Sequence, residues 1–239
     1  AQERDWAVVP YGGGSSVVGG VEAVAEGAEA VITLDTMLLS GMRELDEEAH
    51  TATFGAGTYG PDLEEALQER GYTLGHYPQS FEFSTLGGWI AARGSGQQSN
   101  RYGGASKWMV SAEVITPSGT WRTPRHPSSS TGPDLNAIIA GSEGALGVIT
   151  EATVSIHPVP EARDYRAFLF KDFERGLEAA RELVQAEVPT AMIRLSDGDE
   201  TKFFGAFRQV GKDLPPGQQI ARELLSLGGY EEGGQCMML

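Results

Sequence analysis

The chain has 239 residues, of which 40% are hydrophobic, and 18 Lys and Arg stand against 33 Asp and Glu for a formal net charge of −15. The apolar share is enough for a sizeable core, whereas the acidity excludes binding to nucleic acid through a basic surface and disfavours charge-driven docking on anionic lipid. The single cysteine, Cys236, excludes an internal disulfide and a cysteine metal cluster, so we expect a reducing compartment and no bound metal.

The first part of the chain alternates strand patterns with a glycine loop and a helix. The strand patterns lie at residues 6–9, 30–34 and 50–54. The first of them leads into the loop GGGSS at residues 12–16. Pro61 fits the first turn of a helix with the apolar spacing of DLEEALQER, and Gly71 closes that helix. This succession of strand, turn and helix indicates an α/β unit.

The middle of the chain adds short helices and an antiparallel hairpin. Ser84 is expected to cap the helix STLGGWIAA, and Pro117 and Gly119 provide the turn of the hairpin. The elements expected here are a helix at residues 84–92, hairpin strands at 110–116 and 120–123, a short helix at 134–140 and an antiparallel strand at 147–156.

The segment HPVPE at residues 157–161 interrupts the pattern and is the best candidate for a domain boundary. We expect one domain over residues 1–160 and another over 161–239. The elements expected in the second domain are a strand at residues 165–170, a helix at about 173–187, a strand at 191–195 and further helix. The apolar pattern at residues 235–239 predicts a strand without a partner, so we expect the chain to be a piece of a longer protein.

No apolar run reaches the length of a transmembrane helix. The N-terminal residues AQERDWAVVP lack the basic and then apolar pattern of a signal peptide. We therefore expect a cytoplasmic protein without a transmembrane segment.

Three clusters of glycine and hydroxyl residues stand out, at residues 12–16, 79–96 and 141–150. Glycine lets successive backbone N–H groups converge on an anion, and small hydroxyl side chains add donors. The first cluster alone is ambiguous, because it lacks the helix of a Rossmann loop and the lysine of a P-loop, and a tight surface turn explains it equally well. The three clusters together indicate an extended polyphosphate ligand held by backbone.

The motifs PYGGGSS, SFEFSTLGGW with RGSG and RYG, and GSEGALGVIT followed by PVPE resemble the PCMH-type FAD-binding domain of the vanillyl-alcohol-oxidase superfamily. GHYPQSFEFSTLGGW and TAMIRLSD resemble its alkyldihydroxyacetonephosphate synthase branch more than its lactate or glycolate oxidoreductases. The resemblance covers nearly the whole chain. It implies an α+β fold, with an FAD-binding domain of two α/β subdomains at residues 1–160, its N-terminal part missing, and the start of a truncated α+β cap domain at 161–239.

The resemblance also implies which residues contact FAD. The glycine loop would wrap the pyrophosphate, the second cluster would lie near the pyrophosphate and the isoalloxazine, and the third would lie on the adenosine and ribose side. The implied contacts are Gly12, Gly13, Gly14, Ser15, Ser16, Gln79, Ser80, Ser84, Thr85, Gly88, Arg93, Ser95, Tyr102, Glu143, Gly144 and Ile149.

Some members of the superfamily tie FAD covalently to a histidine that follows the glycine loop. The histidines of this chain lie elsewhere, at His50, His76, His126 and His157. We therefore expect non-covalent FAD. His76 lies beside the second cluster, although a packed or surface histidine is the simpler interpretation for each of the four.

Arg194 is a lone cation in the apolar pattern MIRL, so we expect it either to snorkel or to meet a buried anion. The resemblance implies that this arginine faces the flavin and the substrate as a catalytic residue, and a structural ion pair is the alternative. Trp89 and Trp108 are expected to pack in the core, with pocket walls as the alternative.

The resemblance implies that the parent protein is an FAD-dependent alkyl transferase, which exchanges the acyl group of acyl-dihydroxyacetone phosphate for a fatty alcohol in ether lipid synthesis. An FAD-dependent oxidoreductase of 2-hydroxy acids or related alcohols, and a non-catalytic FAD-binding module, remain alternatives. A homodimer, a peroxisomal location for a eukaryotic parent and peripheral membrane contact are left open. Because the chain lacks the downstream tyrosine and histidine-rich segment of the synthases, we expect it to be inactive by itself.

Overall fold

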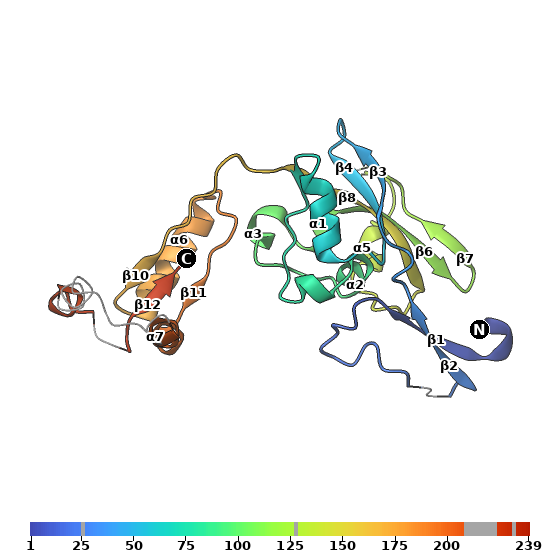
Figure 1. The fold of residues 1–239 in the computed structure, drawn as a ribbon, viewed down its shortest axis with the longest axis horizontal. Helices are drawn as coiled ribbons and strands as arrows, with labels where there is room; N and C mark the ends of the chain where they lie inside the picture. The colour runs from blue at the N-terminus through green and yellow to red at the C-terminus, as the bar shows by residue number, and fades with distance from the viewer. Residues whose placement is uncertain (25–26, 127–128, 208–223, 231–232) are drawn as a thin grey trace. The chain divides into compact units, whose positions relative to one another are not determined.

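The computed structural model describes residues 1–24, 27–126, 129–207, 224–230 and 233–239. Contacts within the chain divide it into two compact units, residues 1–160 and residues 161–239 (Figure 1). Helices and strands occur in both units, so the expected α+β class is confirmed.

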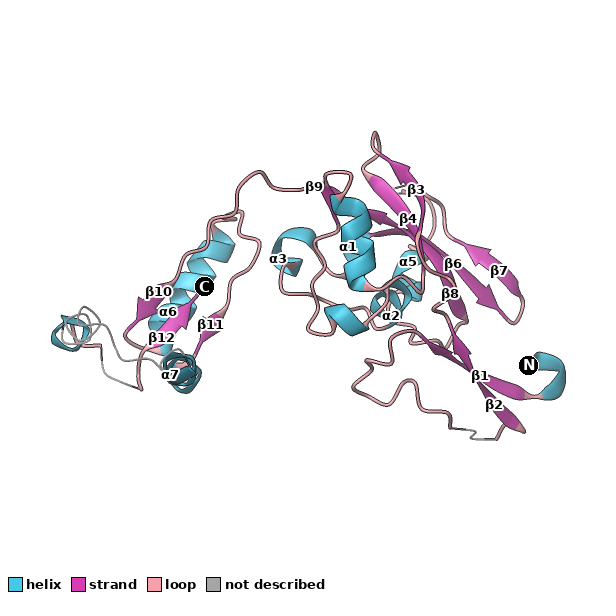
Figure 2. Ribbon diagram, in the orientation of Figure 1, coloured by secondary structure: helices cyan, strands magenta, loops and turns pink. Residues whose placement is uncertain are grey.

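A five-stranded antiparallel sheet is the centre of the first unit, in the order β3–β4–β8–β6–β7 (Figure 2). Its strands are β3 (Met42–Asp46), β4 (Thr51–Gly55), β6 (Met109–Thr116), β7 (Gly119–Arg122) and β8 (Val148–Ser155). Side chains alternate between the two faces: Ala152 and Val154 of β8 are buried in the core. Thr153 lies on the opposite face, where its hydroxyl is 2.8 Å from that of Thr53 on β4. The expected hairpin and the expected strand at 147–156 are confirmed.

Short helices pack against this sheet, α2 on β4 and β8, and α4 and α5 on β6. The helices of the first unit are α1 (Gly60–Gln68), α2 (Leu86–Ala91), α3 (Ser99–Tyr102), α4 (Ala105–Trp108) and α5 (Asn136–Ile139). Pro61 lies in the first turn of α1, and Gly71 follows its end with a φ of +80°, as predicted. The largest fully buried side chains of the core are Trp108, Phe54, Leu63, Leu67, Leu74, Leu86 and Ile90. Burial of such apolar side chains contributes about 1.5–3 kcal/mol each and holds the helices to the sheet.

Glu64 on the inner side of α1 is a buried carboxylate, only 4% exposed. It accepts hydrogen bonds from the backbone N–H groups of Leu74 and Gly75, at 3.1 and 3.0 Å, and from the hydroxyl of Thr73 at 2.7 Å. These bonds offset the cost of burying the charge. They fix the turn after β5 (Tyr72–Thr73), which pairs with β9 (His157–Pro158).

A separate two-stranded sheet carries the glycine loop. Its strands, β1 (Trp6–Tyr11) and β2 (Ala30–Asp35), run parallel, and a 3-10 turn (Gln2–Arg4) precedes them. Parallel strands need a crossover connection, and the glycine loop begins that connection directly after β1. Both strands were predicted and are confirmed.

The second unit is a three-stranded sheet with α6 packed against it. Its elements are β10 (Phe168–Phe170), α6 (Phe173–Gln185), β11 (Leu195–Ser196), α7 (Gly198–Phe207) and β12 (Cys236–Met238). Asp172 caps α6 by accepting a hydrogen bond from the N–H of Arg175. Gly176 lets α6 approach the sheet so closely that a Cβ atom there would lie 2.6 Å from a methyl group of Leu195.

Three local expectations are wrong. The C-terminal strand has partners, because β12 is the central strand of its sheet and pairs antiparallel with both β10 and β11. The strand expected at 191–195 begins only at Leu195. The cap of α2 is Thr85, whose hydroxyl accepts a hydrogen bond from the N–H of Gly88, and not Ser84. The edge strand β3 was not expected at all.

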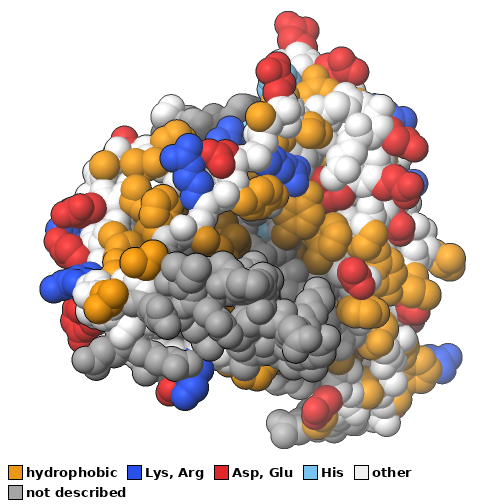
Figure 3. Space-filling model, turned by 60° about the vertical axis from the view of Figure 1, so that its left-hand side comes forward, with side chains coloured by type: hydrophobic (Ala, Val, Ile, Leu, Met, Phe, Trp, Pro, Cys, Tyr) orange, Lys and Arg blue, Asp and Glu red, His pale blue; other side chains and the backbone are white. Residues whose placement is uncertain are grey.

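None of the described helices is long and apolar enough to cross a membrane. Within the described residues, no group of three or more His, Cys, Asp or Glu side chains is placed to hold a metal ion. Acidic side chains are spread over the visible surface, as the net charge of −15 predicts (Figure 3).

Candidate functional site

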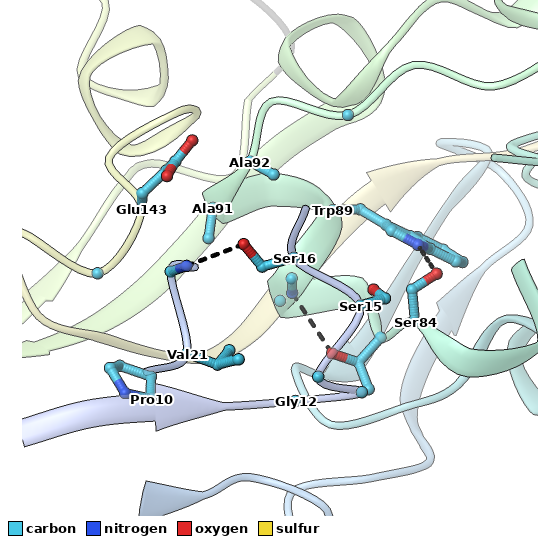
Figure 4. Close-up of a pocket in the computed structure, with 18 of the residues that line it drawn as sticks. Pro10, Gly12, Ser15, Ser16, Val21, Ser84, Trp89, Ala91, Ala92 and Glu143 are labelled. Carbon is cyan, nitrogen blue, oxygen red and sulfur yellow. Dashed lines mark hydrogen bonds between the residues drawn. The ribbon is translucent and has the colours of Figure 1, made fainter. Parts of the chain in front are cut away.

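An open pocket of about 390 Å³ lies within the first unit, where three loops meet beside α2 (Figure 4). We call them the glycine loop (residues 12–16), the second loop (residues 78–85) and the third loop (residues 141–147). The volume is within the range of about 300–1,000 Å³ that small-molecule sites occupy.

The glycine loop crosses the second loop at a distance that only glycine permits. A Cβ atom on Gly13 would overlap the carbonyl oxygen of Phe83, and one on Gly12 would overlap the hydroxyl of Thr85. Gly14 has a φ of +66°, in the left-handed region that favours glycine. Gly12 and Gly13 are therefore needed to bring the two loops together, Gly14 is needed for the turn between them and the rest of the loop, and residues of both loops line the pocket.

The backbone N–H groups of residues 12–16 donate to no acceptor within the part of the chain that the structure describes. The turn that follows is closed by Ser16, whose hydroxyl accepts hydrogen bonds from the N–H groups of Gly20 and Val18, at 3.0 and 3.4 Å (Figure 4). A run of free donors on a pocket-lining loop is the arrangement that binds anionic groups such as phosphate.

In the second loop, the side chains of Ser84 and Thr85 form hydrogen bonds within the protein. The indole N–H of Trp89 donates to the hydroxyl of Ser84 at 2.6 Å, and that hydroxyl donates to the carbonyl of Ser80 at 2.7 Å. A 3-10 turn (Phe81–Phe83) and the Thr85 cap complete the entry into α2. This loop therefore gives the pocket a fixed shape.

The third loop is fastened to the end of α2. The N–H of Gly141 donates to the carbonyl of Ile90 at 2.9 Å, and the N–H of Glu143 donates to that of Ala91 at 3.0 Å. Glu143 has a φ of +47°, which is uncommon for a residue with a side chain. Such backbone conformations cluster at active sites and ligand-binding sites. Among the described residues that line the pocket, Glu143 is the only charged one.

An aromatic cluster stands behind the second loop. The ring of His76, 1% exposed, lies edge-on to Trp89 and Trp108, with centroids 4.7 and 5.1 Å apart. The indole N–H of Trp108 donates to His76 Nδ1 at 3.4 Å, and His76 Nε2 has no partner among the described residues. Burial lowers the pKa of His76 to about 4, so the ring is neutral at pH 7. Nδ1 therefore accepts and Nε2 carries the proton.

Most of the predicted FAD contacts line this pocket. They are Gly12, Gly13, Gly14, Ser15, Ser16, Ser80, Ser84, Thr85, Gly88, Glu143, Gly144 and Ile149. The pocket lining does not include the other four, Gln79, Arg93, Ser95 and Tyr102. Of these, Gln79 is exposed, and Tyr102 is buried against His157, with ring centroids 5.0 Å apart.

Arg194 is not the lone cation that its neighbours predict. Its guanidinium pairs with the carboxylate of Glu200 and lies 5.5 Å from the ring centre of Phe204. The side chain is 46% exposed. These contacts lie within the second unit, and the catalytic role of Arg194 stays a prediction.

Trp89 lines the pocket, which was the alternative to core packing for this residue, whereas Thr36 was not expected there. Trp89 is both a core residue and a wall of the pocket, whereas Trp108 belongs to the core. Thr36 follows β2, and its N–H and hydroxyl both donate to the carbonyl of Tyr11, at 2.9 and 3.1 Å. Only the three-dimensional pairing of β1 with β2 brings Thr36 to the glycine loop, so no local pattern could have identified it.

A family model described as FAD binding domain matches residues 1–124 of this chain. Alkyldihydroxyacetonephosphate synthase of Trypanosoma brucei brucei is 43% identical over 203 residues, which are 84% of this chain and 33% of that protein. An uncharacterized FAD-linked oxidoreductase of Escherichia coli (strain K12) is 36% identical over 202 residues, 83% of this chain and 41% of that protein.

A solved structure of alkyldihydroxyacetonephosphate synthase superposes with a TM-score of 0.85 at 34% identity, over 100% of this chain and 42% of that chain. The chain thus spans between a third and a half of the length of these relatives. The PCMH-type fold and the resemblance to the synthase branch are confirmed. Since the family model matches more than half of the chain, the chain belongs to the FAD binding domain family, and FAD is its cofactor.

Proposed function

We propose that the pocket between the three loops is the FAD site of the first unit. The observation that carries this is the run of free backbone N–H groups at residues 12–16, on a loop that lines the pocket. The described lining residues include no Lys or Arg, so a pyrophosphate would be held by backbone donors and small hydroxyls. Glu143 would accept hydrogen bonds from ribose hydroxyl groups, because its carboxylate repels phosphate.

The residues present fit this cofactor. Glycines at 12–14 would let the backbone approach the pyrophosphate, and Trp89 offers a planar apolar wall for a ring system. When bound, the flavin supplies an electron sink for carbon centres next to it. The chain's own residues bind the cofactor, orient it and exclude water from one side of it.

FAD is bound without a covalent link in this proposal. The described residues that line the pocket include no His, Cys or Tyr, the side chains to which a flavin could be attached. Acid precipitation of the FAD-loaded protein should release all of its flavin into the supernatant. Yellow colour that stays with the precipitate would contradict non-covalent binding.

We further propose that the first unit serves a parent protein of the alkyldihydroxyacetonephosphate synthase type, with the second unit as the start of its cap domain and Arg194 as a catalytic residue. The 43% identity to the trypanosome synthase supports this. The parent would exchange the acyl group of acyl-dihydroxyacetone phosphate for a fatty alcohol. Cytoplasmic location and homodimer formation remain predictions.

The second candidate is an FAD-linked oxidoreductase, supported by the 36% identity to the Escherichia coli protein. The full-length parent separates the two. It should convert acyl-dihydroxyacetone phosphate plus hexadecanol, and it should not reduce a dye with D-lactate. The opposite result would favour the oxidoreductase, and neither reaction would favour a binding module.

The cofactor site can be tested by FAD binding to the chain itself. Titration with FAD, followed by flavin fluorescence, should show one site, and ADP should compete because it shares the phosphates and the adenosine. FMN should compete more weakly, since it lacks the adenosine half. Absence of FAD binding by a folded chain would overturn the proposed site.

A further inference from the structure

The indole of Trp89 is part of the pocket wall and is held by a chain of two hydrogen bonds. Its N–H donates to the hydroxyl of Ser84 at 2.6 Å, and that hydroxyl donates to the carbonyl of Ser80 at 2.7 Å. A serine hydroxyl has one proton, and the Ser80 carbonyl receives it. While this chain is intact, Ser84 cannot donate a hydrogen bond to a phosphate or a carbonyl of a bound ligand.

The ring of Trp89 is also enclosed by other rings. Phe81 lies nearly parallel to it, at 12° and 6.3 Å between centroids, and His76 meets it edge-on at 4.7 Å. Trp89 and Ser84 are 4% and 3% exposed. Apolar packing restricts where the indole can lie, and the hydrogen bond to Ser84 selects the orientation in which its N–H is satisfied.

Ser84 also lies at a junction in the chain. It directly precedes Thr85, which caps α2 and contacts Gly12 of the glycine loop. Figure 4 shows the Ser84 and Trp89 side chains meeting on the same side of the pocket. Ser84 also lines the pocket, but its hydroxyl is engaged by the Trp89 indole and the Ser80 carbonyl, so a change in that hydroxyl acts on the pocket through the indole.

We propose that Ser84 is a positioning residue that fixes Trp89 as a wall of the FAD site, and that it is not itself a ligand of FAD. The effect of Ser84 on FAD binding rests on the proposed function, whereas the hydrogen bond that fixes the indole does not. One measurement tests the hydrogen bond, and another tests the effect on FAD binding.

The first measurement needs no ligand. The chain has four tryptophans, so its NMR spectrum should contain four indole N–H signals, and the signal absent from Trp89→Phe identifies Trp89. In Ser84→Ala, hydrogen exchange of that indole N–H should be at least about tenfold faster, because its acceptor is lost. Ser80→Ala is the matched control: its backbone carbonyl remains, so indole exchange should stay at the wild-type rate. Unchanged exchange in Ser84→Ala would overturn the proposal.

The second measurement is the FAD affinity in a double-mutant cycle. Ser84→Ala should weaken FAD binding about fivefold in the wild-type background, the loss expected when one ordinary hydrogen bond no longer holds the wall. In the Trp89→Phe background the same change should have less than about a twofold effect, because its route to the ligand is gone. An equal loss in both backgrounds would show a direct contact, and no loss in either would show a purely structural bond; both overturn the proposal.

Failure of the proposed function would look different. A wild-type chain that does not bind FAD contradicts the proposed site, while indole exchange still decides whether Ser84 holds Trp89. If Ser84→Ala does not fold, Ser84→Cys provides the same two readouts, since a thiol is a weaker acceptor of similar shape.

Discussion

The glycine loop and the second loop line the same pocket but use their polar groups in opposite ways. In the glycine loop, the backbone N–H groups of residues 12–16 are free among the described residues. In the second loop, the hydroxyls of Ser84 and Thr85 bond within the protein, and aromatic rings pack behind them. Similar glycine and serine motifs can therefore have different roles in one site. One loop supplies donors for a ligand, and the other supplies a rigid surface.

Gly13→Ala should have the largest effect, because it separates the two loops. The added Cβ would overlap the backbone carbonyl of Phe83, which cannot rotate away as a side chain could. We expect FAD affinity to fall at least about 100-fold, or about 3 kcal/mol. Gly205→Ala is the control, since a Cβ there meets no atom of the described residues within 4 Å. Equal FAD affinities of Gly13→Ala and wild type in a titration would show that the loops are not in this contact.

The free energy of unfolding should depend on pH through His76, which packs behind the second loop. The pKa of His76 is lowered to about 4 by burial, so between pH 6.5 and 4 the unfolded chain binds a proton that the folded chain does not. The contribution of His76 to the free energy of unfolding is therefore fully present above pH 6.5. It is lost as the pH falls to about 4, which lowers the free energy of unfolding by roughly 3 kcal/mol.

His76→Gln should remove this contribution. Urea unfolding from pH 7 to pH 4 should give a shallower loss of free energy of unfolding than in wild type, and His126→Gln, at an exposed position, should follow the wild type. Parallel curves for His76→Gln and wild type would mean that the ring is not buried as a neutral group.

Ser16→Ala should have a smaller effect on the glycine loop. It removes the acceptor for the N–H groups of Gly20 and Val18, but leaves the backbone of residues 12–15 in place. We expect FAD binding to weaken by about 1 kcal/mol, or roughly fivefold. Ser118→Ala, in the exposed turn between β6 and β7, is the control and should leave FAD affinity as in wild type. If Ser16→Ala weakened FAD binding more than Gly13→Ala, the Ser16 turn would matter more to the site than the contact between the two loops.

Salt should have the smallest effect. Because the described lining residues include no Lys or Arg, the phosphates would be held by backbone dipoles and not by ion pairs. Raising KCl from 50 to 500 mM should change the Kd for FAD by less than about threefold. A tenfold weakening in the same titration would show that a cationic side chain contacts the phosphates, so that backbone donors of the glycine loop do not hold them alone.

Periodic patterns predicted the regular elements well, and contacts between distant segments were harder to foresee. The alternation in GVITEATVSI gave the buried strand β8, and the apolar spacing after Pro61 gave α1. The edge strand β3 was missed because MRELD has mostly polar side chains, which an edge position tolerates. Ser84 and Thr85 are adjacent hydroxyl residues, and only the structure distinguishes the cap from the residue that holds Trp89.

The candidate site was predictable to the extent that its backbone follows motifs. The glycine loop and the third loop line the pocket as the motifs imply, but side chains next to a motif can point elsewhere. Tyr102 is buried against His157 and Arg93 packs beside Gly141, so neither lines the pocket. Arg194 looked isolated in the sequence because its partner Glu200 lies outside the apolar pattern, in the first turn of α7, and only the fold brings the two side chains together.

Amide hydrogen exchange of residues 12–16, with and without FAD, tests whether these backbone N–H groups hold the pyrophosphate. These N–H groups have no protein acceptor among the described residues, so they should exchange rapidly in the free chain and become strongly protected when FAD is bound. The amides of α1, already bonded within the helix, should change little. FAD binding that leaves the amides of residues 12–16 unprotected would show that the glycine loop does not hold the pyrophosphate.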